Sequence, residues 1–447
     1  MIKRQKIGRG RRHKLVLSWE QLSVYKLGHH FNPQLQVQWD FITQSKLNPR
    51  LATMSLPCEM LDEILIRLPV KDLLRARCVS KGWCSLIDST PFVKRHLSAN
   101  AGAGSLLIRG SAGIGNFYLA SFNAAQDEAT ALEINDPLKT LLVGARIQGA
   151  ANGLVCVSKN NINQLFLINP ATNKSRMIPS APQEFPRSFY YNESSVCGFG
   201  YDHINDDYKV VKIADCFIQF RGIMAIVYSL KTNSWKQIHN VPSNTRFTRD
   251  SGAFADGALY WLGINKPVDI NDTCCKDFLV VFDLGLDQFK EILIPAMKGP
   301  VISFSTRCVD SDGRSLCIID SYPDCHTDLW LMNNSGAEIP WSKLLSVENH
   351  RTQPFRFFRP VYFSRSGESV LLEVDNSKLV WYDLGKKAVK NFLIRGIPNK
   401  FSSHVYTESL VKLTEDKLLQ KPSQDKPEIK QQKRRDDFLS KGFKLRL

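Results

Sequence analysis

The sequence predicts an α+β multidomain protein in which a small all-α domain of three helices is followed by an all-β, propeller-like domain of about six blades. Residues 55–97 carry apolar residues at helical spacing, whereas residues 105–410 repeat short apolar strands separated by turn residues. Both terminal segments are basic and lack these patterns. The expected divisions are a basic extension over 1–53, the helical domain over 54–98, a linker over 99–104, the β domain over 105–410 and a charged tail over 411–447.

Three apolar stripes define the helical domain. They are Leu61, Ile64, Leu65 and Leu68, then Val70, Leu73, Leu74 and Cys78, then Trp83, Leu86 and Ile87. Pro69 is expected to end the first helix, Ser80 to cap the third, and the sequence Asp-Ser-Thr-Pro at 88–91 to end it. Three short helices in about forty residues bury little surface, so this domain is expected to need a partner.

The same residues resemble the F-box family. Leu-Pro at 56–57, Ile-Leu at 64–65, Arg-Leu-Pro-Val at 67–70, Leu-Leu at 73–74, Arg77, Val-Ser-Lys at 79–81, Trp83 and Pro-Phe at 91–92 stand in that family's order and spacing. The resemblance implies docking onto a Skp-type adaptor and, through it, onto a cullin–RING ubiquitin ligase. Apolar anchors on an amphipathic helix fit such a groove, and the predicted adaptor contacts are Leu56, Pro57, Ile64, Leu68, Pro69 and Leu73. Trp83 is expected mainly to hold the three helices together. Met54 stands immediately before the stretch at 55–97, and we hypothesise that it is an alternative or the true start.

A repeat defines the β domain. Turn residues recur before apolar strands at Asn152, Asp206, Asp256, Asp312 and Ser366, at intervals of 50 to 56 residues. A second strand and turn follow in each unit, and a fainter unit begins near Gly102. Such a repeat is typical of propeller blades, each of which buries its sheet against its neighbours. A sandwich and an open solenoid are the alternatives.

This domain resembles the F-box-associated domain of plant F-box proteins. The resemblance rests on Gly-Leu-Val-Cys at 153–156, Asn-Pro-Ala-Thr at 169–172, Gly-Phe-Gly-Tyr-Asp at 198–202, Tyr-Ser-Leu at 228–230 and Gly-Ala-Leu-Tyr-Trp at 257–261. The paired glycines of kelch blades and the Trp-Asp dipeptides of another propeller family are missing. Trp235 and Phe289 recur after the second turn of their units, where we expect them to fill space between adjacent sheets.

Motifs for chemistry are missing from the sequence. Cys325-His326 has no partners at metal-ligand spacing, and the glycine run at 110–115 lacks the Lys-Ser/Thr of a phosphate loop. We therefore expect no metal, no cofactor and no enzyme activity; an enzyme built from carboxylates that converge in the fold is the alternative. The eleven cysteines form no C-x-x-C motif, and no signal peptide or membrane span is recognisable. This pattern predicts reduced thiols in the cytoplasm, the nucleus or both.

The net charge of +16 lies mostly outside the predicted domains. Residues 1–50 and 411–447 together supply 13 of the 16 positive charges, and the body between them is nearly balanced. Solvated tails are therefore favoured over nucleic-acid contacts.

Three segments of the β domain mix arginine with aromatic residues, both of which are favoured interface anchors. From these segments the predicted substrate contacts are Arg187, Tyr190, Arg246, Arg249, Phe355, Arg356 and Arg359. The arginines favour an acidic or phosphorylated segment on the target protein. The other interpretation is that some of these rings fill gaps between blades.

The combined expectation is a non-catalytic, substrate-recognition subunit of an SCF-type (Skp–cullin–F-box) ubiquitin ligase, whose β domain binds an unknown protein substrate. The alternatives are a non-degradative adaptor bound to the Skp-type protein alone and a basic-tailed, nucleic-acid-binding propeller.

Overall fold

The computed structural model describes residues 58–100, 104–111, 115–122, 128–159, 162–182, 195–216, 222–242, 245–247, 251–265, 277–294, 306–311, 315–322, 326–332, 341–348, 357–364 and 366–413. The chain divides into two compact units, Met1–Asp62 and Glu63–Leu447. Only residues 58–62 of the first unit are described, and they form the start of a helix. Within the described ranges, no helix is long and apolar enough to span a bilayer.

Four helices, not the expected three, occupy the predicted helical domain: α3 (Cys58–Leu65), α4 (Val70–Ala76), α5 (Lys81–Ile87) and α6 (Thr90–Ala99). Ser80 caps α5 as expected, because its Oγ accepts a hydrogen bond from the Trp83 N–H at 3.1 Å. Residues 88–91 end the third helix as predicted, with Asp88 as its C-cap, but they also begin a fourth helix that was not predicted. Ser89 Oγ accepts from the Phe92 N–H at 3.4 Å, and Pro91 stands in the first turn, so this segment starts α6.

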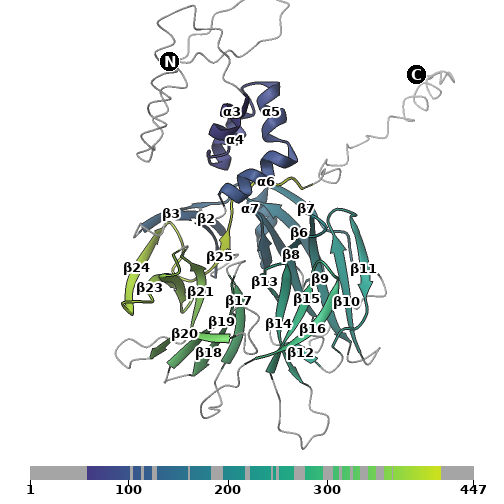
Figure 1. Ribbon diagram of the computed structural model, residues 1–447, viewed down its shortest axis with the longest axis vertical. Coiled ribbons are helices and arrows are strands. Elements are labelled where there is room, and N and C mark those ends of the chain that lie inside the picture. Colours follow the sequence, from purple (N-terminus) through teal and green to yellow (C-terminus); the bar gives the residue numbers. More distant parts are fainter. Residues whose placement is uncertain are drawn as a thin grey trace, which may run out of the picture. The chain divides into compact units, whose positions relative to one another are not determined.

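The rest of the described chain is mostly β-strand, with one further short helix, α7 (Leu138–Leu142) (Figure 1). Three sheets follow the chain in simple antiparallel order. They are β4 (Arg146–Ala151), β5 (Leu154–Lys159), β6 (Gln164–Asn169) and β7 (Lys174–Met177); β8 (Ser195–Asp202), β9 (Asp207–Cys216), β10 (Gly222–Ser229) and β11 (Ser234–Ile238); and β17 (Thr306–Ser311), β18 (Leu316–Tyr322), β19 (His326–Met332) and β20 (Trp341–Glu348). Each therefore has the strand order of a four-stranded meander.

A fourth sheet splits its first strand in two. Both β12 (Thr245–Phe247) and β13 (Ala253–Ala255) pair with β14 (Ala258–Asn265), which is followed by β15 (Asp277–Asp283) and β16 (Gln288–Leu293). The two short strands together occupy the place of one first strand.

The fifth sheet joins the two ends of the β domain. Its strands are β21 (Phe358–Phe363), β22 (Ser369–Val374), β23 (Lys378–Asp383), β24 (Ala388–Arg395), β3 (Glu128–Glu133), β2 (Phe117–Phe122), β1 (Gly104–Gly110) and β25 (Phe401–Tyr406). The pair β24–β3 is parallel and three residues long, whereas β25 pairs with β1 in antiparallel register over six residues. The last strand of the domain thus completes a group begun by the first three.

The repeated turns recognised in the sequence open on a polar side chain and end on a left-handed residue. Between the third and fourth strands, the turn ends at Asn173, Asn233, Asp287 or Lys387, with φ of 53° to 54°. The side chain that opens the turn accepts backbone N–H groups; Asp283 Oδ1, for example, accepts from Gly285 and Leu286, both at 3.0 Å. The conformation of these turns depends on the residues within them, which explains why their spacing is visible in the sequence.

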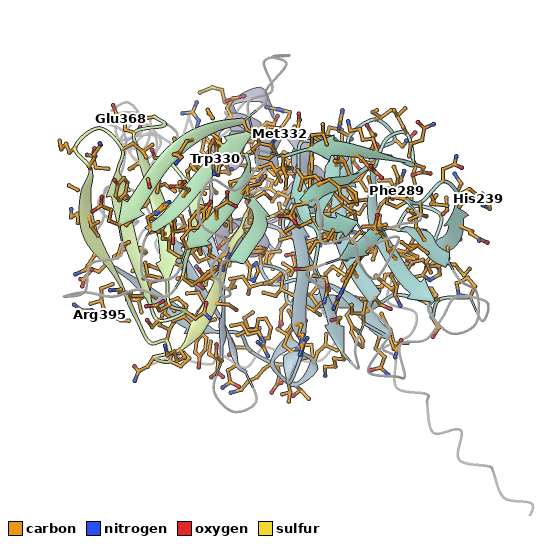
Figure 2. The ribbon with its side chains drawn as sticks, turned by 90° about the horizontal axis from the view of Figure 1, so that it is seen from below. His239, Phe289, Trp330, Met332, Glu368 and Arg395 are labelled. Atoms are coloured by element: carbon orange, nitrogen blue, oxygen red, sulfur yellow. The ribbon has the colours of Figure 1, made fainter. Side chains whose placement is uncertain are left out.

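The apolar core lies between neighbouring sheets. One cluster combines Leu107 and Phe117 of β1 and β2 with Ile147 and Val155 of β4 and β5, and the other clusters are built in the same way. Trp235 and Phe289 pack against such clusters, with ring centroids 5.4 Å from Tyr228 and 4.7 Å from Phe282, which agrees with the space-filling role expected of them. Figure 2 shows the apolar side chains that fill these spaces, and labels Phe289 among them.

Candidate functional site

The connection between α3 and α4 carries the predicted adaptor contacts that the structure describes. Pro69 is exposed there, and Ile64 and Leu68 are partly buried. Leu56 and Pro57 lie outside the described residues.

Leu73 differs from the other predicted contacts. Its side chain is fully buried, together with Leu65, Ile66, Val70, Ile87 and Phe92. Leu73 therefore packs beneath the α3–α4 connection and has no exposed area with which to contact an adaptor. The stripe in the sequence showed that Leu73 faces the same side as other apolar residues, but not which of them stays exposed.

Helix α6 fixes the α3–α4 connection. His96 Nε2 lies 2.9 Å from the carbonyl oxygen of Leu68, and Asn100 Nδ2 donates to the carbonyl of Ile66 at 3.2 Å. Burial lowers the pKa of His96, and the hydrogen bond to Leu68 only partly opposes this effect. The neutral ring then donates from Nε2, which is consistent with the buried Nδ1 having no hydrogen-bond partner. No helix was expected after residue 91, so nothing in the sequence pattern pointed to His96 or Asn100.

The direction of the strands separates two ends of the β domain. Because neighbouring strands are antiparallel, the connections after the first and third strands of each meander lie at one end, and those after the second and fourth strands lie at the other. An isolated parallel bridge between Cys197 and Ser251, and the parallel pair β24–β3, align the directions of neighbouring sheets. We call the second end the loop end.

Of the predicted substrate contacts, the structure describes only Arg246 and Arg359, and both lie on strands. Arg246 lies on β12, is exposed, and is paired in register with Ile264 near the end of β14. Arg359 is 8% exposed and forms an ion pair with Glu373, so it has no surface to offer a substrate. Arg187, Tyr190, Arg249, Phe355 and Arg356 lie outside the described residues.

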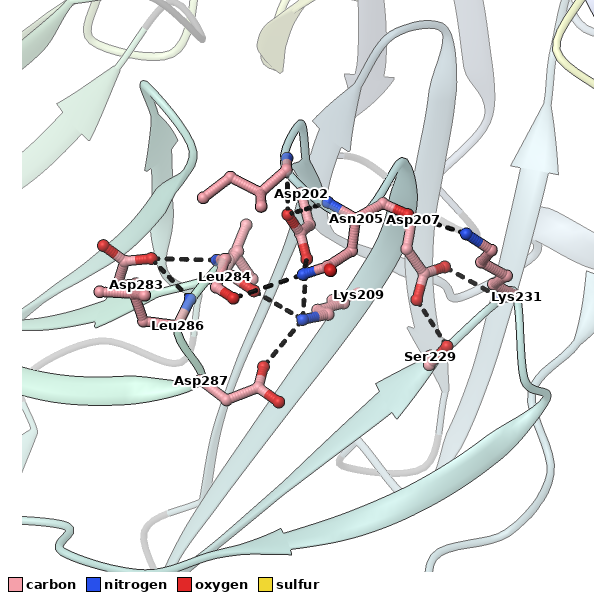
Figure 3. A network of polar contacts seen from close by, with 12 residues as sticks. Asp202, Asn205, Asp207, Lys209, Ser229, Lys231, Asp283, Leu284, Leu286 and Asp287 are labelled. Carbon is pink, nitrogen blue, oxygen red and sulfur yellow. Dashed lines mark hydrogen bonds and ion pairs between the residues drawn. The ribbon is translucent and has the colours of Figure 1, made fainter.

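A cluster of charged side chains in the β domain surrounds Lys209 (Figure 3). Its Nζ lies 2.6 Å from the carbonyl of Leu284, 2.8 Å from Asp287 Oδ1 and 2.9 Å from Asp202 Oδ2. Burial alone would lower the pKa of Lys209, but the hydrogen bonds and charges of Asp287 and Asp202 outweigh burial and raise it. All three ammonium protons therefore have acceptors, and this cluster joins two sheets without offering a reactive group. The described part of the chain contains no group of three or more side chains suited to a metal ion.

The comparison with known families agrees with this architecture. The family model described as "F-box domain" matches residues 54–95. The family model described as "F-box associated beta propeller domain" matches residues 116–413. The chain is a plant F-box protein with an F-box associated β-propeller domain.

Two relatives from Arabidopsis thaliana align over almost their whole length. F-box protein CPR1 is 29% identical over 88% of this chain and 99% of its own, and F-box protein At4g22390 is 27% identical over the same shares. Among solved structures, an oligogalacturonate lyase in complex with manganese matches with a TM-score of 0.37 and 12% identity, over 64% of this chain and 73% of its own. That likeness is too weak to carry an argument about function.

Proposed function

We propose that this protein is a non-catalytic substrate-recognition subunit of an SCF-type ubiquitin ligase, acting in the cytoplasm, the nucleus or both. In this proposal the F-box docks onto a Skp-type adaptor, and the β domain binds the protein to be ubiquitinated. The observation that carries the proposal is the exposed α3–α4 connection, where Pro69 and the partly exposed Ile64 and Leu68 stand over a buried support that includes Leu73. Apolar anchors held in this way fit a groove on a partner.

For the β domain we propose a closed, six-bladed propeller. Each of the four meanders or split meanders counts as one blade, and the eight-stranded sheet divides at the short parallel pair β24–β3 into two. Residue pairs in contact link the first strands in the cyclic order β25, β4, β8, β13, β17 and β21, and β21 also contacts β25. A rigid ring of this kind supports a binding surface made of the connections at its loop end. Holding a target beside the ligase would then raise the rate of ubiquitin transfer through effective concentration.

Co-purification tests the docking step. The full chain is expected to bind a purified Skp-type adaptor and, through it, a cullin, and Pro69→Asp and Leu68→Asp are each expected to abolish this binding. Leu286→Asp is the matched control, because Leu286 is an apolar residue of the β domain that is 62% exposed. Circular dichroism of each variant separates lost docking from lost folding. An adaptor that ignores the folded wild-type chain, or that binds Pro69→Asp as well as wild type, would refute the docking role.

A further inference from the structure

Arg109, at the loop end of the first blade, forms no ion pair with any residue that the structure describes. Arg109 is the second-last residue of β1 and is paired in register with Phe117 of β2 and with Ser402 of β25. Its side chain is partly buried, and its Nε is shielded from solvent without a hydrogen-bond partner in the described structure. A guanidinium donates up to five hydrogen bonds, so leaving it buried and unsatisfied is costly.

A second positive charge stands close to Arg109. Arg146 begins β4, the first strand of the neighbouring blade, and its side chain is exposed. Burial lowers the pKa of Arg109, and the charge of Arg146 lowers it further, while no carboxylate contributes in the opposite direction. Leu107, two residues before Arg109 on the same face of β1, packs in one cluster with Ile147, the neighbour of Arg146 on β4. The charge of Arg146 therefore adds to the positive potential at Arg109, and this potential favours an anion there.

Because Gly115 has no side chain, the guanidinium of Arg109 can approach the backbone there closely. Gly115 has φ of 68°, and a Cβ built there would lie 3.2 Å from Arg109 Nη2. The same glycine borders a depression lined by Asn116, Phe117, Lys139 and Leu142. Most side chains that line the depression are apolar, and Lys139 is ion-paired with Glu133 at 3.2 Å. The group left to bind an anion here is therefore the unsatisfied guanidinium of Arg109 beside Gly115. This arrangement is typical of a subsite that orients one anionic group.

We propose that Arg109 and Arg146 form a subsite for a carboxylate or phosphate group on the protein captured by the β domain. The planar fork of Arg109 would bind the two oxygens of the anion, and Arg146 would add charge from the neighbouring blade. That the anion belongs to a captured protein rests on the proposed function above. The binding of an anion by these two arginines does not.

Residue-specific chemical modification tests the subsite on the full-length chain. Phenylglyoxal modifies accessible guanidinium groups, and the extent at each arginine is read by peptide mass spectrometry. Inorganic phosphate, with ionic strength held constant by sodium chloride, is expected to slow modification of Arg109 several-fold and to leave Arg395 unchanged. Arg395 is the reference because it lies on β24 and its side chain is 64% exposed. Equal protection of both arginines, or protection of neither, would overturn the proposal.

Peptides then distinguish the two sources of the anion. A short polyglutamate peptide and a peptide of alternating glycine and phosphoserine are tested for protection of Arg109 in place of phosphate. Arg109→Gln is expected to lower the affinity for the protecting peptide several-fold, Arg109→Lys less, and Lys290→Gln not at all. Lys290 is the matched control for loss of one charge, because it is exposed on β16, far along the chain. If Lys290→Gln weakens binding as much as Arg109→Gln, only the net charge matters and the subsite does not exist.

The use of two Arg109 variants keeps the test decisive even if one of them misfolds. If Arg109→Gln fails to fold, the wild-type footprint and Arg109→Lys still decide the question. Because the footprint needs no adaptor, a chain that binds phosphate at Arg109 but ignores the Skp-type protein would refute the proposed function alone. A chain that binds the Skp-type protein but shows no protection of Arg109 by phosphate would refute the subsite alone.

Discussion

The guanidinium of Arg359 and the carboxylate of Glu373 form a buried ion pair, with Nη2 and Oε2 3.1 Å apart and side chains that are 9% and 0% exposed. The pair also holds the last strand of the domain. Glu373 Oε2 accepts the backbone N–H of Ser403 at 2.6 Å as well as the Ser403 hydroxyl, and Arg359 donates to the Ser403 carbonyl. Since Ser403 lies on β25, which also pairs with β1, these bonds link the two ends of the β domain.

Glu373→Gln is expected to destabilise the β domain strongly. The amide keeps the size of the side chain but leaves the buried charge of Arg359 without its counterion, a change that typically costs about 3–5 kcal/mol. Urea unfolding followed by tryptophan fluorescence measures the loss. The control is Glu128→Gln, which removes the ion pair of Glu128 with Arg395 at 2.7 Å; these side chains are 56% and 64% exposed. For such an exposed pair the cost is about 1 kcal/mol or less. Equal losses in the two variants would contradict a special role for the buried pair.

Gly153→Ala is expected to displace the segment that follows β25. Gly153 has φ of 82°, and an added Cβ would overlap the Ser409 side chain and lie 2.6 Å from the carbonyl oxygen of Thr407. The segment is otherwise held by Asn169, whose Nδ2 donates to the carbonyls of Ser409 and Val411 at 3.0 and 2.9 Å.

Gly367→Ala separates this clash from backbone strain. Gly367 has φ of 71°, but nothing lies within 4 Å of a Cβ built there. The control should therefore lose only the cost of a left-handed alanine, about 1 kcal/mol, whereas Gly153→Ala should lose at least twice as much. Limited proteolysis near residue 410, together with thermal unfolding, measures both effects. A similar loss of stability in the two variants would show that the segment after β25 moves aside without lowering the stability further.

Local chemistry explains what the sequence predicted well. The turn before β5 places Asn152 and Gly153 at φ of 50° and 82°, and the turn before β14 places Asp256 and Gly257 at 44° and 75°. Asn, Asp and Gly tolerate this conformation far better than other residues, so their recurrence marked the strands directly. The fourth helix, α6, also had a local signal in Ser89 and Pro91, but Pro91 was interpreted as a helix end.

The sequence predicted the roles of residues poorly where these roles depend on contacts between distant positions. Arg359 follows three aromatic residues and resembled an interface anchor, yet its partner Glu373 is 14 residues away and Ser403 is 44 residues away. Arg109 shows the opposite case. It lies in the apolar strand Gly104–Gly110, and only the fold shows that the charge of Arg146 acts on it and that its Nε has no hydrogen-bond partner among the described residues.

Leu73→Ala is expected to unfold the F-box without affecting the β domain. Leu73 is fully buried, and removing such a side chain usually costs about 2–5 kcal/mol, which a small helical domain tolerates poorly. Hydrogen exchange of α3 to α6 should accelerate, while exchange of strands such as β9 should stay unchanged. Val79→Ala is the control, because Val79 is 54% exposed and its truncation removes few contacts. Slow exchange in Leu73→Ala combined with loss of adaptor binding would instead indicate a direct contact.

The stability of the F-box is expected to fall at mildly acidic pH because of His96. Its pKa is lowered from 6.5 in the folded state, where burial disfavours the charged ring. Below pH 6.5 the unfolded chain therefore binds a proton that the folded chain does not, and the free energy of unfolding decreases as the pH falls toward the folded pKa. Well above pH 6.5 the ring is neutral in both states and this contribution is constant.

His96→Gln removes the titration while keeping a side-chain N–H that can donate to the Leu68 carbonyl. Hydrogen exchange of α3 to α6, corrected for the intrinsic pH dependence, is compared between about pH 7.5 and about pH 5.5, on either side of the unfolded pKa of histidine. Protection in the wild type should decrease more than in His96→Gln. The change should be confined to these helices, because His96 contacts the α3–α4 connection and stacks on Phe92, with ring centroids 6.2 Å apart. An equal decrease in both proteins would assign the acid sensitivity to other groups and leave His96 with a packing role alone.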